Sequence, residues 1–193
     1  MSTPVRILLV SGSTRSGSTN TAVLRTARHV APDRLIAVLY EGLSDLPAFN
    51  PDDDERPDAA VAALRREIAA SDAVLLCTPE YAGSLPGSFK NLLDWTVGSG
   101  ELYGKPVAWL NVAAAGRGEG ASAALETVLR YVGATVVERA CARLPVGREM
   151  VGPDGLVADP TIRAGIADVL GTILRHLDGI GDRTHGGPIG PGS

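Results

Sequence analysis

Residues 5–20 read VRILLVSGSTRSGSTN, and this stretch decides the fold. Its first part, residues 5–10, is a short apolar run that is typical of a strand buried on both faces. It leads through glycine and hydroxyl residues into residues 20–30, where apolar side chains recur at helical spacing until Pro32 ends the pattern. A buried strand, a tight loop and a helix in this order are the repeating unit of a parallel sheet.

The same alternation continues along the chain. We expect further strands at residues 35–40, 73–77, 106–112 and 135–143, and further helices at residues 59–70, 88–97, 121–132 and 162–177. Five strands alternating with five helices imply right-handed crossovers and an α/β fold, a three-layer sandwich with a five-stranded parallel sheet. We expect one domain over residues 1–178, an exposed excursion at residues 41–57 and a flexible Gly/Pro-rich tail at residues 179–193.

Composition excludes several classes of partner. The chain has 193 residues, of which 45% are hydrophobic and 21% charged, and its formal net charge is −4. An acidic balance gives no attraction to nucleic acid or anionic lipid, and no apolar run approaches the roughly 18 residues that span a bilayer. We therefore expect a cytoplasmic protein with no nucleic-acid or membrane partner. Cys77 and Cys141 lack the spacing of a metal site and are expected to be buried thiols.

Residues 12–20, GSTRSGSTN, form a predicted anion site. Backbone amides and hydroxyls can donate to phosphate oxygens, the following helix adds partial positive charge, and Arg15 adds a guanidinium group. Helix capping alone explains one hydroxyl but not five beside an arginine. No Gly-Lys-Ser/Thr follows, which excludes a triphosphate P-loop, and Thr14 breaks the G-x-G-x-x-G fingerprint. Glu41, after the second strand, keeps a dinucleotide alternative open.

Residues 78–87, TPEYAGSLPG, follow the third predicted strand. Two prolines and two glycines fix an extended turn whose backbone can face a flat heteroaromatic ring, and Gly83 permits close approach. A purely structural turn explains this loop equally well when it is taken alone. In a parallel sheet, however, the loops after the first, third and fourth strands converge at one switch point, so they are expected to form one ligand site.

Two motifs together resemble the NADPH-dependent FMN reductase family, whose fold is flavodoxin-like. They are Gly12-Ser13-x-Arg15-x-x-Ser18-x-Asn20 and Pro79-Glu80-Tyr81-x-Gly83-Ser84-x-Pro86-Gly87-x-x-Lys90-Asn91-x-x-Asp94-Trp95. The resemblance also includes residues 46–52, and beyond about Gly133 it is only a general pattern. It departs from the family at Ala82, where Asn is usual, and at Arg117, in a loop where small hydroxylated residues are common.

The resemblance implies FMN as cofactor and NADPH or NADH as hydride donor. It implies that the FMN phosphate is held by Ser13, Arg15, Ser18, Thr19 and Asn20. It implies that the isoalloxazine is bordered, largely through backbone, by Pro79, Glu80, Tyr81, Gly83 and Ser84. It implies a third flavin loop that contains Ala115, Gly116, Gly118 and Gly120, in which Arg117 either contacts the nicotinamide cofactor or is simply solvated.

The predicted function is an oxidoreductase that passes hydride from NAD(P)H through bound flavin to a small acceptor such as a quinone, azo compound, metal oxyanion or free flavin. Placement of the flavin is the main requirement, so no catalytic side chain is assigned. The chain has no G-x-S-x-G elbow, and its histidines lie outside the candidate site, which argues against a hydrolase. A flavodoxin-type electron carrier and a non-enzymatic FMN-binding domain remain alternatives. By resemblance we expect a homodimer or homotetramer.

Overall fold

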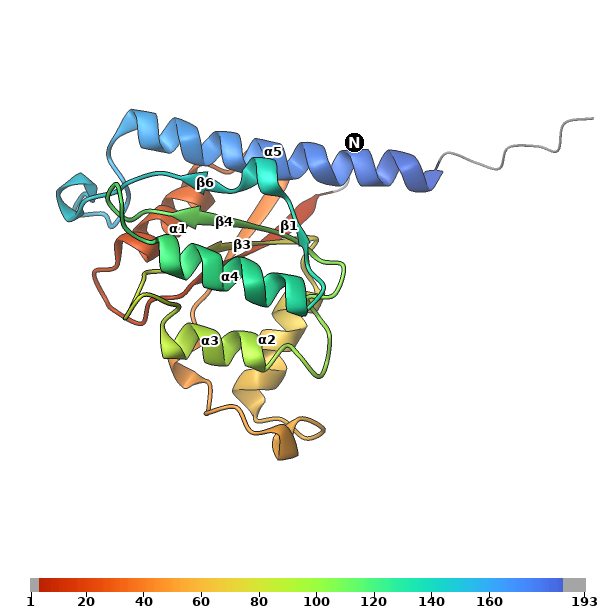
Figure 1. The fold of residues 1–193 in the computed structure, drawn as a ribbon. Helices are drawn as coiled ribbons and strands as arrows, with labels where there is room; N and C mark the ends of the chain where they lie inside the picture. Colours follow the sequence, from red (N-terminus) through yellow and green to blue (C-terminus); the bar gives the residue numbers. More distant parts are fainter. Residues whose placement is uncertain (1–3, 186–193) are drawn as a thin grey trace, which may run out of the picture.

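The computed structural model describes residues 4–185 and contains a parallel sheet in the order β2-β1-β3-β4-β5, with β6 also paired to β4 (Figure 1). The strands are β1 (Val5–Ser11), β2 (Leu35–Tyr40), β3 (Ala73–Cys77), β4 (Pro106–Asn111), β5 (Thr135–Val136) and β6 (Ala142–Arg143). The helices are α1 (Thr19–Val30), α2 (Ala59–Ala69), α3 (Gly87–Asp94), α4 (Glu119–Tyr131) and α5 (Pro160–His185). This strand order is that of flavodoxin-like folds, as expected.

Each face of the sheet has its own apolar core. Along β1, Ile7 and Leu9 are fully buried in a cluster with residues of α1 and α5. Leu8 and Val10 point the other way, into a cluster with residues of α2, α3 and α4. Because consecutive strand residues face opposite sides, a strand that is apolar at both parities must be covered on both faces. The predicted three-layer sandwich is therefore confirmed.

The last predicted strand, residues 135–143, is wrong as a continuous element. β5 and β6 are two residues each, and a 3-10 turn (Glu138–Ala140) separates them, although both pair with β4. The turn is closed by a hydrogen bond from the Ala140 amide to the Val137 carbonyl (2.8 Å) and places Ala140 fully in the core. An edge position with only one neighbouring strand tolerates this break, because fewer ladder hydrogen bonds are lost.

Two other segments are more ordered than expected. α5 continues to His185, so the predicted tail at 179–193 begins inside the helix; residues 186–193 lie outside the described part of the chain. The excursion at 41–57 is docked on α3, where the Trp95 indole nitrogen donates to the Pro47 carbonyl (2.9 Å) and the Phe49 ring meets Trp95 edge to face. Among residues 4–185, no helix is both long and apolar enough to cross a bilayer.

Candidate active site at the carboxyl ends of the strands

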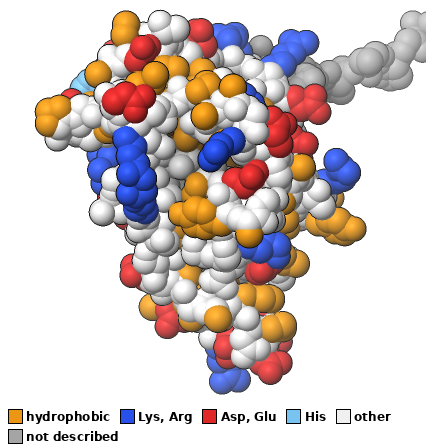
Figure 2. Space-filling view, turned by 60° about the vertical axis from the view of Figure 1, so that its left-hand side comes forward, with side chains coloured by type: hydrophobic (Ala, Val, Ile, Leu, Met, Phe, Trp, Pro, Cys, Tyr) orange, Lys and Arg blue, Asp and Glu red, His pale blue; other side chains and the backbone are white. Residues whose placement is uncertain are grey.

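A cavity of about 400 Å³ lies where β1, β3 and β4 end, and we name it the strand-end cavity. Small-molecule sites occupy about 300–1,000 Å³, so its size suits a cofactor. Five of the residues that the resemblance assigns to FMN line it: Thr19, Asn20, Pro79, Glu80 and Gly118. They come from the start of α1, which follows the β1 loop (12–18), from the β3 loop (78–86) and from the β4 loop (112–118). Figure 2 views this end of the molecule.

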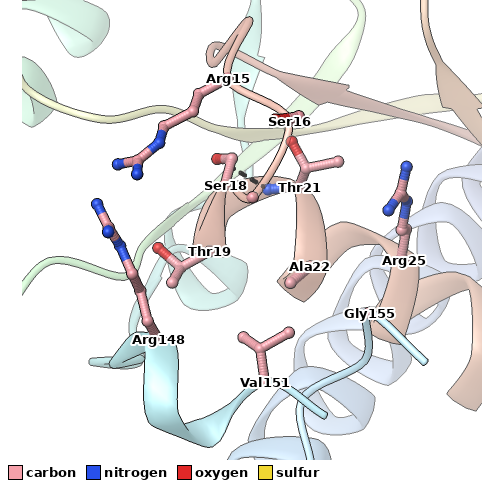
Figure 3. Close-up of a pocket in the computed structure, with 11 residues that line it drawn as sticks. Arg15, Ser16, Ser18, Thr19, Thr21, Ala22, Arg25, Arg148, Val151 and Gly155 are labelled. Atoms are coloured by element: carbon pink, nitrogen blue, oxygen red, sulfur yellow. Dashed lines mark hydrogen bonds between the residues drawn. The ribbon is translucent and has the colours of Figure 1, made fainter. Parts of the chain in front are cut away.

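The β1 loop keeps most of its donors free. Ser18 caps α1, its hydroxyl accepting from the Thr21 amide at 3.4 Å, and the Ser13 hydroxyl accepts from the Arg15 amide at 3.3 Å. Both distances are long for such bonds, which indicates weak internal ties. Ser13 does not line the strand-end cavity, and Arg15 and Ser18 line an adjoining one of about 370 Å³ (Figure 3).

Asn20 is oriented from below by the core. The Cys77 thiol donates to Asn20 Oδ1 at 3.3 Å, and burial raises the pKa of Cys77, which keeps it protonated at neutral pH. With Oδ1 engaged, the Asn20 amide nitrogen is the donor that remains for a ligand in the strand-end cavity. Cys77 thus has a supporting role. The prediction of a buried thiol is confirmed for Cys77 and is wrong for Cys141, which is only half-buried.

The β3 loop is a tight two-residue hairpin turn. Tyr81 and Ser84 exchange two backbone hydrogen bonds of 3.0 Å, and the residues between them, Ala82 and Gly83, have φ of 49° and 74°. Both angles are left-handed, as a type I′ turn requires, and an alanine is unfavourable there. Residues 81–84 are exposed and do not line the strand-end cavity, whereas Pro79 and Glu80 do.

The β4 loop and the start of α4 are packed directly on the β3 loop. Glu80 Oε2 accepts from the Ala121 amide at 3.1 Å, in the first turn of α4. A β-carbon on Gly120 would overlap the Gly83 carbonyl oxygen, so the two backbones touch. The predicted glycine loop 116–120 thus ends at Gly118, and Gly120 is helical. Ala115 and Gly116 are exposed and do not line the strand-end cavity.

A model of the NADPH-dependent FMN reductase family matches residues 5–146. The chain belongs to this family. It is similar to a quinone reductase of Escherichia coli (strain K12), with 36% identity over 111 residues that cover 55% of this chain and 59% of the relative. It is also similar to the NAD(P)H-dependent FMN reductase PA1204 of Pseudomonas aeruginosa, with 40% identity over 120 residues, 61% of this chain and 64% of the relative. The chain therefore spans less than two thirds of these relatives.

Among solved structures, the flavoenzyme NAD(P)H:(acceptor) oxidoreductase FerB from Paracoccus denitrificans is similar over 89% of this chain and 98% of its own. The sequence identity is 29% and the TM-score 0.77. An azoreductase from Bacillus anthracis str. Sterne is 18% identical with a TM-score of 0.56, a likeness that shows the fold alone.

The FMN reductase family motifs end before one wall of the site. Val146, Gly147 and Arg148 follow β6 and line the strand-end cavity, and Arg148 also lines the adjoining cavity. Sequence reasoning missed them because the resemblance beyond about Gly133 is only a general pattern. The available signal was topological, since the carboxyl end of the last strand must reach the same edge of the sheet as the others.

The residues present fit FMN. Thr19 and Asn20, at the start of α1, line the strand-end cavity together with Arg117 and Arg148. The one carboxylate that lines this cavity, that of Glu80, is engaged by the Ala121 amide. A site with free donors, arginines and a single occupied carboxylate favours a phosphorylated ligand.

Proposed function

We propose that this chain is an FMN-dependent NAD(P)H oxidoreductase that passes hydride to a small acceptor such as a quinone, azo compound, metal oxyanion or free flavin. The observation that carries the proposal is the strand-end cavity, in which Thr19 and Asn20, directly after the β1 loop, face a closely packed backbone wall of the β3 and β4 loops. Membership of the NADPH-dependent FMN reductase family supports the cofactors. Relatives named quinone reductase and NADPH azoreductase support the classes of acceptor.

In this proposal the phosphate end of FMN is held by the β1 loop. Arg15, Ser18, Thr19 and the Asn20 amide nitrogen are the donors, and Arg148 adds charge from the opposite wall. Charge-assisted hydrogen bonds of this kind are the strong ones, and they fix the position of the ligand along the cavity.

The ring end would lie against Pro79, Glu80 and Gly118. Contact between Gly83 and Gly120 and the hydrogen bond from Ala121 to Glu80 hold this wall in place. Bound flavin supplies the hydride chemistry, accepting from NAD(P)H and donating to the acceptor. The side chains position the ring and exclude water, so none of them is assigned as an acid or base.

The test is a spectrum of the purified protein with added FMN, followed by anaerobic addition of NADPH. We expect a flavin spectrum that bleaches on NADPH addition and returns when a quinone is supplied. Retained flavin that NADPH does not bleach would indicate a flavodoxin-type electron carrier. A colourless protein that takes up no FMN would indicate a domain without flavin function.

We also propose that the chain forms a homodimer or homotetramer, which rests on the resemblance to the family. The strongly exposed side chains of Tyr103 and Tyr131 provide apolar surface that association could bury. Light scattering at micromolar concentration is the test, and a monomer would contradict this proposal.

A further inference from the structure

The second cavity, of about 370 Å³, is bordered by three arginines, and we name it the arginine cavity. It lies between the β1 loop, the first turns of α1 and residues 148–155. Figure 3 shows Arg15 and Arg148 reaching toward each other on one side, with Arg25 on the other. Hydroxyl residues of the β1 loop complete its polar wall, and no acidic residue lines it.

Within the described residues, no ion pair neutralises the arginines of this cavity. Arg6, Arg65 and Arg143 each pair with a carboxylate, whereas no carboxylate within the described residues pairs with Arg25 or Arg148. Three cations around one hollow repel one another, and this arrangement occurs in a chain whose formal net charge is −4. A cavity lined by one sign of charge concentrates ligands of the opposite sign.

The arginine cavity adjoins the strand-end cavity, because Thr19 and Arg148 line both. A group bound in one therefore lies close to a group bound in the other. FMN carries one phosphate, which the proposed function places at the β1 loop. Arg25, one turn further along α1, lies beyond that position and near Gly155, so its charge is available to another phosphate. Val151 and the largely buried Ala22 form the apolar part of the lining of the arginine cavity.

We propose that the arginine cavity binds the phosphorylated adenosine half of a dinucleotide, with Arg25 and Arg148 facing its phosphates. This inference rests on the proposed function. The shared chemistry has two sources: NADPH, through its 2′-phosphate, and FAD, through its adenylyl phosphate. The cavity suits a phosphate group next to an apolar ring, and both dinucleotides carry such a group.

The first experiment compares Arg25→Ala with the wild-type protein. We expect the KM for NADPH to rise about tenfold, the KM for NADH to change little and the Kd of FMN to stay the same, because one charge-assisted contact is lost. Arg25 is exposed on a helix, and alanine favours helix, so the variant should fold. Arg28→Ala is the matched control, since Arg28 is exposed on the same helix but does not line the cavity.

The second arm compares FAD with FMN. If FAD is the source, the wild-type protein binds FAD more tightly than FMN, and Arg25→Ala removes that difference. A variant that leaves the NADPH to NADH preference and the FAD to FMN preference both unchanged would overturn the inference.

A third measurement does not depend on turnover. Adenosine 2′,5′-bisphosphate is titrated calorimetrically into the FMN-loaded wild-type protein and into Arg25→Ala. Binding that weakens about tenfold in the variant, and that weakens with added salt, supports the cavity even if NADPH oxidation is absent. In that case the proposed function fails and the inference stands. If the wild-type protein oxidises NADPH but Arg25→Ala changes neither the NADPH to NADH preference nor the FAD to FMN preference, the proposed function stands and the inference fails.

Discussion

The β1 loop borders the arginine cavity and the β3 loop borders the adjoining strand-end cavity, and the two loops are held in different ways. In the β3 loop, Tyr81 and Ser84 close a turn with two hydrogen bonds of 3.0 Å, and Glu80 is fixed by the Ala121 amide. In the β1 loop the side-chain bonds are longer, at 3.3 and 3.4 Å, and Arg15 has no carboxylate beside it in the described chain. One loop uses its polar groups internally, and the other leaves them for a ligand.

This difference assigns two roles to one site. A loop whose hydrogen bonds are satisfied can present a fixed surface to a flat ring without reorganising when the ligand arrives. A loop with free donors can form new hydrogen bonds to a ligand, so it should contribute most of the affinity for an anion. Changes in the β3 loop should therefore alter stability first, and changes in the β1 loop should alter phosphate binding first.

The largest expected effect comes from the contact between the β3 loop and α4. Gly120→Ala introduces a β-carbon that overlaps the Gly83 carbonyl, a backbone atom that cannot rotate away. Alanine favours a helix by about 1 kcal/mol, but overlap with a backbone atom should cost the upper end of the overpacking range, about 3 kcal/mol, so we expect a net loss of about 2 kcal/mol. Urea unfolding measures the loss.

Gly87→Ala is the matched control for this change. Gly87 begins α3 at the other end of the β3 loop, and a β-carbon there would meet nothing within 4 Å. We expect its stability to lie within about 0.5 kcal/mol of the wild type. Equal losses in both variants would show that the Gly83 to Gly120 contact has no special importance.

The second effect concerns the β1 loop. Arg15→Ala should weaken FMN about 10- to 100-fold, because a hydrogen bond to a charged group contributes about 1.5–3 kcal/mol. Riboflavin, which has no phosphate, is the internal control, and its Kd should not change. Fluorescence quenching of each flavin measures both constants. A parallel loss for both flavins would place Arg15 against the ring instead and would remove the distinction between the two loops.

Much of the fold could be predicted from the sequence, because the positions of apolar residues along a strand show which of its two faces are buried. β1 is apolar at every position but one up to Val10, and it is covered on both faces. The broken edge at 135–143 could not be predicted in this way, since its turn buries Ala140 as a strand would. The packing of residues 41–57 against α3 could not be predicted either, because it depends on Trp95, which is far away in the sequence.

The candidate site was predictable where backbone and residue type act locally. Thr19, Asn20, Pro79, Glu80 and Gly118 line the strand-end cavity. Tyr81, Gly83 and Ser84 do not, because two left-handed residues fold the segment into a turn that points to solvent. Arg148 was missed because its place is set by the path of the chain after β6, which no local motif records.

A smaller effect is expected at Glu80, which joins the two walls of the ring end. Glu80→Ala removes the acceptor for the Ala121 amide and should cost about 1 kcal/mol, as the loss of a helix cap does. Glu80→Gln keeps an acceptor oxygen but loses the charge near the start of α4, which should cost about 0.5 kcal/mol. Urea unfolding separates the two, and a Gln variant as unstable as the Ala variant would mean that charge dominates.

The smallest effect is a gain in stability at Ala82. Ala82→Asn places a residue that tolerates the left-handed conformation at φ 49°, and we expect the free energy of unfolding to rise by about 0.5–1 kcal/mol. Ala115→Asn is the control, since Ala115 is exposed in the β4 loop without a positive φ. The Kd of FMN should be equal in all three proteins, because residues 81–84 do not line the strand-end cavity. A gain in stability for Ala82→Asn without a change in Kd would mean that the strained backbone at residue 82 lowers the stability of the protein but does not affect flavin binding. A changed Kd would instead show that the turn contacts the flavin, and the two loops would then share the task of binding.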